Sequence, residues 1–420
     1  MNKISRRHFL KLAGAAPALA ATPPLLKAQS VSGRVVVVGG GFAGATLAKY
    51  LKLWGGAGVA VTLVDANPAH VSCILSNLVL TNSLNLSQIT FNYAALQQLG
   101  VNFVQGRATG LEKPAGSTWR VQIAGRTPLD CEHVVLAPGI EFQPVAGWDP
   151  NKVPHAWQAG AQTTLLKQQI QTMPAGGLFI MTIPPKPYRC PPGPYERACV
   201  VADYLKRTKP GSKVIVLDAN PGIVAEPETF TKAFAQTHAG VIEYHPNAAL
   251  LAVNSDQRIA NTSVGDFKAD VLNVIAPQKA GALITSAGLT GTGLWAPVNP
   301  LNYESMIGGM EGVHIIGDSQ GTGQPKSGHI ANAEAKVCAD AILRAFAGEA
   351  PDPAPTTNSA CYSPITANTA SWLTAVYAYN PATKTMDLVP ASFGEAASPT
   401  RDNYEDMFDW SANLFADTFA

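Results

Sequence analysis

The sequence has few charged residues, and the two signs are almost balanced. Asp, Glu, Lys and Arg make up 14% of the 420 residues, and 30 basic residues against 29 acidic ones leave a net charge of +1. A nucleic-acid-binding surface needs many basic side chains to neutralise phosphates. The composition therefore argues against a nucleic-acid partner.

Long apolar runs, internal repeats and haem-attachment motifs are also missing. The uncharged stretch Leu12 to Leu26 is shorter than the about 20 residues that a transmembrane helix needs, and it contains Pro17, Pro23 and Pro24. Without a repeat, a solenoid is excluded. Without a Cys-x-x-Cys-His motif, the chain cannot itself carry a covalent c-type haem. At about 150 residues per domain, the length predicts two or three folding units.

The first 30 residues have the pattern of an export signal. Residues 5–11 contain the pair Arg6-Arg7, and an apolar segment and small residues follow them. This order is typical of a twin-arginine signal, whose receptor exports folded proteins. We predict a signal peptide over 1–30 and a periplasmic mature protein without an integral membrane segment. A membrane anchor is the alternative, and the prolines disfavour it.

A dinucleotide-binding pattern follows the signal. An apolar strand runs into Gly39, Gly41 and Gly44, and a helix and a second strand, Val59 to Val64, come next and end at Asp65. The glycines permit a tight turn, close approach of a pyrophosphate and close helix packing, and an acid at the end of the second strand suits ribose hydroxyls. The pattern predicts a site for FAD or NAD.

Two later stretches resemble the FAD motifs of the disulfide-reductase superfamily. One is the apolar run 134–138 that ends at Gly139, and the other is the run 313–317 that ends at Asp318. The second is followed by Lys326, directly before a predicted helix whose N-terminus would face the flavin. The resemblance implies FAD, with Gly139, Asp318 and Lys326 near it. The alternative for Asp318 is an ordinary turn or helix-capping acid.

Between these motifs lies a second α/β unit that lacks a phosphate loop. Strands are predicted at Gly177 to Ile183, Lys213 to Leu217 and Val271 to Ile275. The first of them runs into residues 184–197, a stretch rich in proline. Because proline has no N–H donor, this loop cannot cradle a pyrophosphate. The unit therefore has the position of an NAD domain without its chemistry.

The segments RCPPGPYER (189–197) and NSACYS (358–363) resemble the flavoprotein subunit of flavocytochrome c sulfide dehydrogenase. The resemblance implies a redox-active disulfide between Cys190 and Cys361 and an active-site acid at Glu196. We further expect Arg189 to lower the pKa of the Cys190 thiol. The alternatives are a purely structural disulfide and a solvated or salt-bridged Glu196.

The stretch HVSCILSN (70–77) resembles the covalent flavin attachment site of the same family, which implies a thioether from Cys73 to FAD. The alternative is a buried apolar cysteine. Cys131 and Cys338 lie in apolar patterns and are predicted to be core residues, whereas the role of Cys199 stays open.

The implied fold is α/β and glutathione-reductase-like, with two Rossmann-like domains and a C-terminal domain. An FAD domain is expected over 31–150 and 278–350, and a second Rossmann-like domain over 151–277. A flavin and interface domain is expected over 351–420. No metal site is predicted.

The implied function is oxidation of hydrogen sulfide to persulfide or elemental sulfur, with electrons passed to a c-type cytochrome subunit in a heterodimer. The alternatives are a sulfide:quinone oxidoreductase and a non-catalytic flavin-binding electron-transfer subunit. A quinone enzyme must reach lipid, yet the predicted helix Asp402 to Phe419 carries five acids and no bases. Its face of Tyr404, Phe408, Ser411 and Phe415 is expected to pack on a protein partner or in the core.

Overall fold

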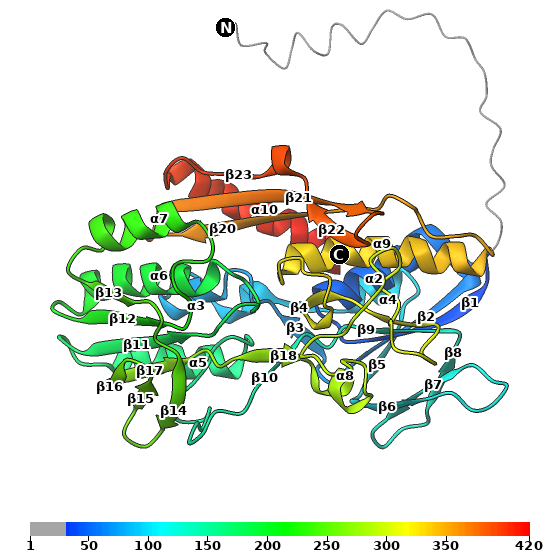
Figure 1. Ribbon diagram of the computed structural model, residues 1–420, viewed down its shortest axis with the longest axis horizontal. Helices are drawn as coiled ribbons and strands as arrows, with labels where there is room; N and C mark the ends of the chain where they lie inside the picture. The colour runs from blue at the N-terminus through cyan, green and yellow to red at the C-terminus, as the bar shows by residue number, and fades with distance from the viewer. Residues whose placement is uncertain (1–30) are drawn as a thin grey trace, which may run out of the picture. The chain divides into compact units, whose positions relative to one another are not determined.

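The computed structural model describes residues 31–420, so the predicted signal peptide lies outside the described residues (Figure 1). A five-stranded parallel sheet of order β19-β9-β1-β2-β5 forms the first layer. Its strands are β1 (Gly33–Val38), β2 (Val59–Asp65), β5 (Asn102–Gln105), β9 (His133–Leu136) and β19 (Val313–Ile315). Their continuous apolar runs are typical of parallel strands that are covered on both faces.

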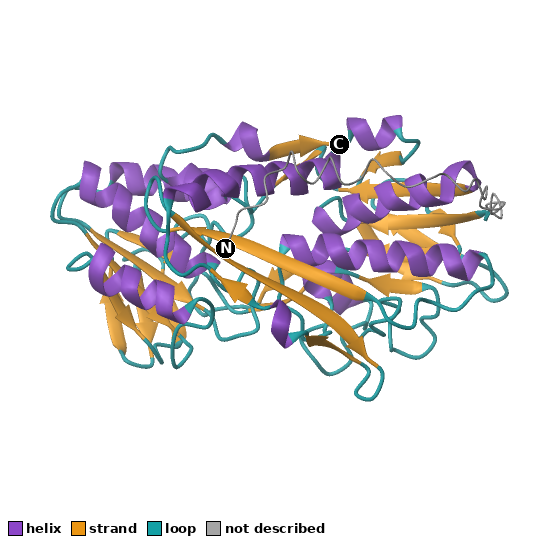
Figure 2. Ribbon diagram, turned by 90° about the horizontal axis from the view of Figure 1, so that it is seen from above, coloured by secondary structure: helices purple, strands orange, loops and turns teal. Residues whose placement is uncertain are grey.

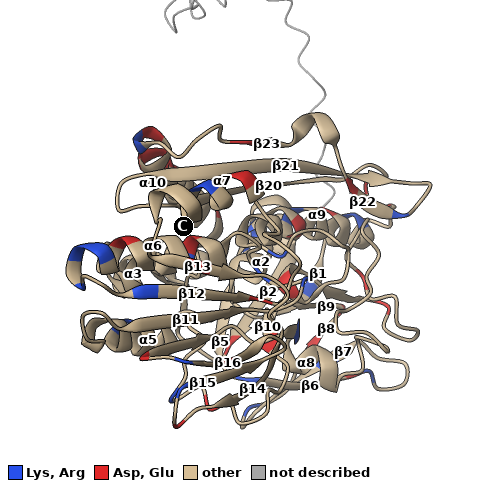
Figure 3. Ribbon diagram, turned by 60° about the vertical axis from the view of Figure 1, so that its left-hand side comes forward, with Lys and Arg blue, Asp and Glu red and all other residues tan. Residues whose placement is uncertain are grey.

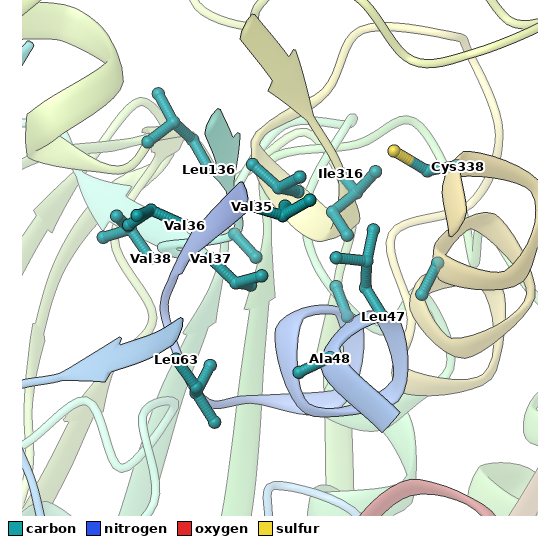
Figure 4. Close-up of a cluster of buried hydrophobic side chains, with 14 of the residues drawn as sticks. Val35, Val36, Val37, Val38, Leu47, Ala48, Leu63, Leu136, Ile316 and Cys338 are labelled. Carbon is teal, nitrogen blue, oxygen red and sulfur yellow. The ribbon is translucent and has the colours of Figure 1, made fainter. Parts of the chain in front are cut away.

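Helices α2 (Phe42–Gly55) and α9 (Gly328–Phe346) pack together against this sheet. In the core, Val35 and Val37 of β1 point toward the side of Leu47 of α2 and Cys338 of α9, and Val36 and Val38 point to the opposite face of the sheet (Figure 4). Cys338 and Cys131 are both fully buried, which confirms their assignment to the core.

A second parallel sheet has the order β13-β12-β11-β17. Its strands are β11 (Leu178–Ile183), β12 (Lys213–Asp218), β13 (Ile242–His245) and β17 (Val271–Val274), so the three predicted strands are confirmed. Helices α5 (Ala161–Thr172) and α6 (Gly193–Thr208) contribute to its core. Cys199 of α6, whose role the sequence left open, is fully buried in that core.

The chain leaves the first sheet through β10 (Ile140–Phe142) and returns through β18 (Gln278–Ala280), and these two strands pair with each other (Figure 1). The domain boundaries expected from the sequence lie at 150/151 and 277/278. The division into domains itself stays an interpretation.

A long antiparallel sheet forms the C-terminal part, visible across the centre of Figure 2. It consists of β20 (Thr356–Pro364), β21 (Ala370–Asn380), β22 (Thr385–Leu388) and β23 (Gly394–Glu395), and helix α10 (Arg401–Phe419) follows it. Ser411 and Phe415 of α10 are buried, and Phe415 packs in the core with Phe42 and Phe91, whereas Tyr404 and Phe408 are half-buried. Core packing, one of the two alternatives for this face, therefore holds for its C-terminal half.

Smaller elements complete the fold. The remaining strands are β3 (Ala69–Val71), β4 (Thr90–Asn92), β6 (Ala108–Glu112), β7 (Trp119–Ile123), β8 (Leu129–Cys131), β14 (Leu250–Asn254), β15 (Ile259–Thr262) and β16 (Gly265–Lys268). The short helices are α3 (Ser76–Leu80), α4 (Ala94–Gln98), α7 (Pro227–Lys232) and α8 (Ala282–Ser286). Acidic and basic residues are scattered along the ribbon (Figure 3). Within 31–420, no helix is both long and apolar enough to cross a bilayer.

Candidate active site

A cavity of about 1130 Å³ is lined by residues of the first sheet, of β20, and of the loop and helix that follow β11. Its lining includes the β1–α2 turn, parts of 64–77, 137–141, 156–161 and 189–197, Gly317 and Asp318, parts of 327–331 and 360–364, and Trp410. Most small-molecule pockets measure about 300–1,000 Å³. The size therefore fits an extended ligand such as a dinucleotide.

The β1–α2 turn has the geometry that the glycine motif predicts. Gly39 has a φ of +103°, and a Cβ there would lie 2.3 Å from the carbonyl oxygen of Ala137. At Gly44 a Cβ would lie 1.9 Å from the carbonyl oxygen of Gly39. Gly41 lines the cavity at the N-terminus of α2, where free N–H groups and the helix dipole attract anions. A pyrophosphate fits this turn.

Asp65 lies at the end of β2 and lines the cavity, as expected. Its Oδ2 accepts a hydrogen bond from the backbone N–H of Gly40 at 2.6 Å, and its Oδ1 accepts one from Asn67 at 2.7 Å. The carboxylate therefore also shapes the turn. Each oxygen keeps a free lone pair for a ribose hydroxyl, and that contact stays a prediction.

Asp318 follows β19 and presents an unused acceptor to the cavity. Its Oδ1 is buried and has no hydrogen-bond partner within residues 31–420, and burial raises the pKa of this carboxyl. It does not cap α9, because Ser327 accepts the hydrogen bond from Ile330 at the start of that helix. A buried acceptor left without a partner fits a ligand hydroxyl.

The side chain of Lys326, which the resemblance places near the cofactor, is not part of the cavity lining. Its Nζ donates to the carbonyl oxygen of Gln320 at 2.6 Å and lies 3.8 Å from the ring centre of Trp295, away from the cavity lining. Burial lowers the pKa of this ammonium group to about 8. Its backbone carbonyl accepts a hydrogen bond from the N–H of Cys190 at 2.7 Å and so holds the proline-rich loop in place. Gly139, by contrast, does line the cavity.

Cys190 and Cys361 both line the cavity, one from the loop before α6 and the other from β20. Both are thiols here, and no disulfide is formed among residues 31–420. Burial raises the pKa of Cys361 to about 12 and that of Cys190 well above its usual range. The charge of Cys361 also raises the pKa of Cys190, so the two sulfurs lie within electrostatic reach of each other.

The expected effect of Arg189 on the Cys190 thiol is present, but it does not decide the net pKa. The positive charge of Arg189 does act in the lowering direction, but burial of the thiol raises the pKa by more. A buried thiolate loses its hydration, and a neighbouring charge only partly replaces it.

Glu196 lies in the first turn of α6 and lines the cavity with the two cysteines. Burial raises the pKa of its carboxyl to about 8. Its Oε1 accepts a hydrogen bond from Nδ2 of Asn77 at 2.9 Å, and the charge of Arg197 acts against burial by lowering the pKa. Glu196 is therefore neither solvated nor simply salt-bridged, and it can hold a proton near neutral pH.

Arg197 and Asn77 are site residues that the sequence reasoning missed. The guanidinium of Arg197 is buried and donates to Oδ1 of Asn77 at 2.9 Å, to Oδ1 of Asn273 at 2.9 Å, and to the carbonyl oxygens of His155 and Ala156 at 3.0 and 2.6 Å. Both residues belong to the sequence motifs at 189–197 and 70–77, so the sequence did contain a signal for these two site residues. Only the fold reveals that they connect the two motifs.

Cys73 is half-buried and lines the cavity, and its Sγ lies 3.4 Å from the carbonyl oxygen of Trp157. It is thus not a buried core cysteine. Its position suits a bond to a ligand in the cavity, and the bond itself stays a proposal.

Most of the chain matches known protein families. Residues 33–163 match the pyridine nucleotide-disulphide oxidoreductase family, 163–276 match the central part of the sulfide dehydrogenase [flavocytochrome c] flavoprotein chain, and 353–419 match the flavin-binding part of flavocytochrome c sulphide dehydrogenase. A sulfide dehydrogenase [flavocytochrome c] flavoprotein chain from Chlorobaculum thiosulfatiphilum is 54% identical over 46 residues, which are 11% of this chain and 94% of that sequence. The chain belongs to this flavoprotein family.

Membership of the flavocytochrome c sulfide dehydrogenase flavoprotein family makes the chain an FAD oxidoreductase and confirms the recognised resemblance. Residues 3–23 match the twin-arginine signal, which confirms the prediction of export to the periplasm. These residues lie outside the part that the structure describes.

Solved structures confirm the fold class. The sulfide:quinone oxidoreductase of Aquifex aeolicus aligns with a TM-score of 0.74 at 15% identity, over 92% of each chain. A NAD-dependent persulfide reductase from A. fulgidus aligns with a TM-score of 0.60 at 16% identity, over 91% of this chain and 77% of that one. At such identities the similarity concerns the fold alone.

Proposed function

We propose that this protein oxidises hydrogen sulfide to a persulfide or elemental sulfur at a Cys190–Cys361 disulfide beside FAD, and passes the electrons to a c-type cytochrome subunit. The observation that carries the proposal is that one cavity is lined by the FAD motifs, by both cysteines and by Glu196. The coarser statement, sulfide oxidation by a flavoprotein, is what the family of this chain supports.

In the proposed reaction, a hydrosulfide ion attacks one sulfur of the disulfide. A new S–S bond forms to the substrate, the Cys190–Cys361 bond breaks, and the second cysteine leaves as a thiolate. The substrate sulfur is oxidised by two electrons, and the protein disulfide is reduced by the same two. Bound FAD would take this electron pair from the thiolate side and release it one electron at a time, which suits a haem acceptor.

Glu196 is suited to the proton transfers of this reaction. With a pKa of about 8 its carboxyl is mostly protonated at neutral pH, so it can give a proton to a leaving thiolate and take one from a persulfide. The positive charges of Arg189, which lines the cavity, and of Arg197 favour the entry of an anionic substrate.

The proposed FAD ligands are the residues whose geometry fits it. Gly39, Gly41 and Gly44 would receive the pyrophosphate, and Asp65 and Asp318 the hydroxyls of the ribose and the ribityl chain. We assign this role to the segments 31–150 and 278–350, and covalent attachment to Cys73. The sulfur chemistry is assigned to the proline-rich loop within 151–277 together with the segment 351–420.

Bleaching of the flavin absorbance by sulfide under anaerobic conditions tests the redox pair. The wild-type protein is expected to bleach, and Cys190→Ser and Cys361→Ser are expected to abolish the response. Cys199→Ala is the matched control, because Cys199 belongs to the same region but does not line the cavity. Bleaching that survives Cys190→Ser would contradict the proposed chemistry and favour a non-catalytic electron carrier.

Two further measurements test the attachment and the acceptor. After acid denaturation the flavin is expected to stay with the wild-type polypeptide and to leave Cys73→Ala; complete release from the wild type would contradict the thioether.

The sulfide-reduced protein is expected to reduce a soluble c-type cytochrome faster than a soluble quinone. The reverse order would favour a sulfide:quinone oxidoreductase.

A further inference from the structure

Cys190 has an unusual backbone conformation that the proposed reaction does not by itself explain. Its φ is +58°, a left-handed conformation that is uncommon for a residue with a side chain. Such a conformation persists only where the surrounding structure holds it. The sulfur is confined as well, because a Cβ on Gly193 would lie 2.8 Å from Sγ of Cys190. The contacts around this cysteine therefore decide how its sulfur is presented.

Two hydrogen bonds from outside the loop hold the backbone at this point. The N–H of Arg189 donates to Oε1 of Gln278 at 2.8 Å. The N–H of Cys190 donates to the carbonyl oxygen of Lys326 at 2.7 Å. Of these two acceptors, only the one on Gln278 belongs to a side chain, so a substitution can remove it without changing the loop itself.

Gln278 is a costly residue for the place that it occupies. It begins β18, the strand on which the chain returns from the second sheet, and it is 3% exposed. Its Oε1 accepts from Arg189, whereas its Nε2 is buried without a partner within residues 31–420. A buried amide with one end unsatisfied costs free energy that an apolar side chain of similar size would not. Core stability therefore does not explain this glutamine, and its bond to the loop does.

The loop is held in this way before the two cysteines are joined. Cys190 and Cys361 are thiols here, and the hydrogen bond from Arg189 to Gln278 is already in place. A segment that is held in advance in its final geometry has less freedom to lose when a bond closes. The hold on the loop therefore favours closure of a Cys190–Cys361 disulfide.

We propose that Gln278 is a positioning residue that holds Cys190 ready for disulfide formation with Cys361. This inference rests on the proposed function, because it concerns the same pair of cysteines. With glutathione disulfide as oxidant, two S–H bonds of the protein break and one S–S bond forms, and the two electrons and two protons go to two molecules of glutathione. Without the acceptor on Gln278, the reduced loop gains freedom that closure must remove, so the dithiol is favoured.

The equilibrium of the flavin-loaded protein with glutathione, measured without sulfide and without oxygen, tests the inference. The fraction of Cys190–Cys361 disulfide is determined by mass spectrometry after acid quenching. Gln278→Met removes the acceptor and nearly keeps the size of the side chain. It is expected to move the equilibrium roughly tenfold toward the dithiol, since one net hydrogen bond contributes a factor of that order. The shift corresponds to about 30 mV.

Two variants are the controls. Gln278→Glu keeps an oxygen acceptor at the same reach and is expected to restore the wild-type equilibrium. Gln143→Met removes a neighbouring hydrogen bond, from Nε2 of Gln143 to the carbonyl oxygen of Gln278 at 3.1 Å, and leaves the contact with the loop in place, so it should match the wild type. A lowered Tm in Gln278→Met with an unchanged thiol–disulfide equilibrium would show a merely structural role and overturn the inference.

Should Gln278→Met not fold, Gln278→Asn takes its place, because the shorter side chain withdraws the oxygen from the N–H of Arg189 and should shift the equilibrium in the same direction. The absence of any shift in Gln278→Asn would then overturn the inference. Because sulfide takes no part in these measurements, a shift in a protein whose flavin sulfide does not bleach would overturn the proposed function and leave the role of Gln278 standing. Bleaching without a shift would do the opposite.

Discussion

Burial sets the protonation of individual residues in the redox site more than neighbouring charges do. The thiols of Cys190 and Cys361 and the carboxyl of Glu196 all have raised pKa values, and burial is the largest cause in each case. A water-poor cavity disfavours every ionised form. These three groups therefore remain protonated until a step of the reaction removes a proton.

The raised pKa of Glu196 predicts a pH-dependent stability. The pKa of Glu196 is about 8 in the folded protein, and the ordinary pKa of a glutamate is 4.5. Between pH 4.5 and pH 8 the folded protein therefore keeps a proton that the unfolded chain has released. The contribution of Glu196 to the free energy of unfolding is fully present below 4.5 and is lost as the pH rises through 8. At about 1.4 kcal/mol per pKa unit, the loss is on the order of a few kcal/mol. Glu196→Gln is expected to flatten this decline, measured as Tm against pH.

Exposed Glu228, changed to Gln, is the control for this measurement, and its Tm profile should follow the wild type. A Glu196→Gln profile with the wild-type slope would show that Glu196 does not titrate in this range.

The buried guanidinium of Arg197 predicts a large loss of stability on substitution. Arg197→Met leaves Asn77, Asn273 and two carbonyl groups without their donor, and unpaired buried polar groups cost about 1–3 kcal/mol each. We expect a loss of about 3–5 kcal/mol in urea unfolding of the flavin-loaded protein. Arg207→Met, which removes a half-exposed arginine of the same helix, should cost less than about 1 kcal/mol. Equal losses would refute this account of Arg197.

At the scale of elements, α10 is held against α2 and the β3–β4 pair by aromatic packing. Phe419 lies 5.6 Å from Phe42 and 4.9 Å from Phe91, measured between ring centres, and stacks on His70. His70 lines the cavity, so the last helix helps to shape the wall of the cofactor site. The C-terminal segment is therefore part of the site and not an appendage.

Phe419→Ala is expected to lower the free energy of unfolding by about 3–5 kcal/mol, because it leaves a cavity in an aromatic cluster. Phe393→Ala removes a ring that is 51% exposed and should change it by no more than about 0.5 kcal/mol. Chemical denaturation monitored by flavin fluorescence measures both. A small effect at Phe419 would mean that α10 packs only loosely.

At the scale of the whole molecule, the second parallel sheet keeps the topology of a nucleotide domain, while the loop after β11 presents Cys190 to the cavity. The loop holds Pro184, Pro185, Pro187, Pro191 and Pro192. Without their N–H groups it offers little to a pyrophosphate. The fold places a sulfur atom in the part of the molecule where a nicotinamide cofactor would otherwise be expected.

NADH is therefore expected to leave the flavin spectrum unchanged at concentrations where sulfide bleaches it completely. Anaerobic titration with each reductant, followed by visible absorption, measures the difference. Rapid bleaching by NADH would show that the second domain binds a nicotinamide cofactor after all.

The sequence by itself determined the local features of this protein. Strands β1, β2, β11 and β12, the glycine turn and the export signal could be read directly, because apolar runs, glycine spacing and paired arginines act over short stretches of chain. The proline-rich loop excluded a phosphate cradle for the same reason, since a missing N–H is a property of the residue.

Only the tertiary structure decided which distant groups meet and how burial changes them. It placed the Lys326 ammonium group against Trp295, connected Arg197 to Asn77 and raised the pKa of Cys190 despite Arg189. Desolvation and long-range hydrogen bonds depend on the complete packed chain, so no local pattern of residues could have revealed them.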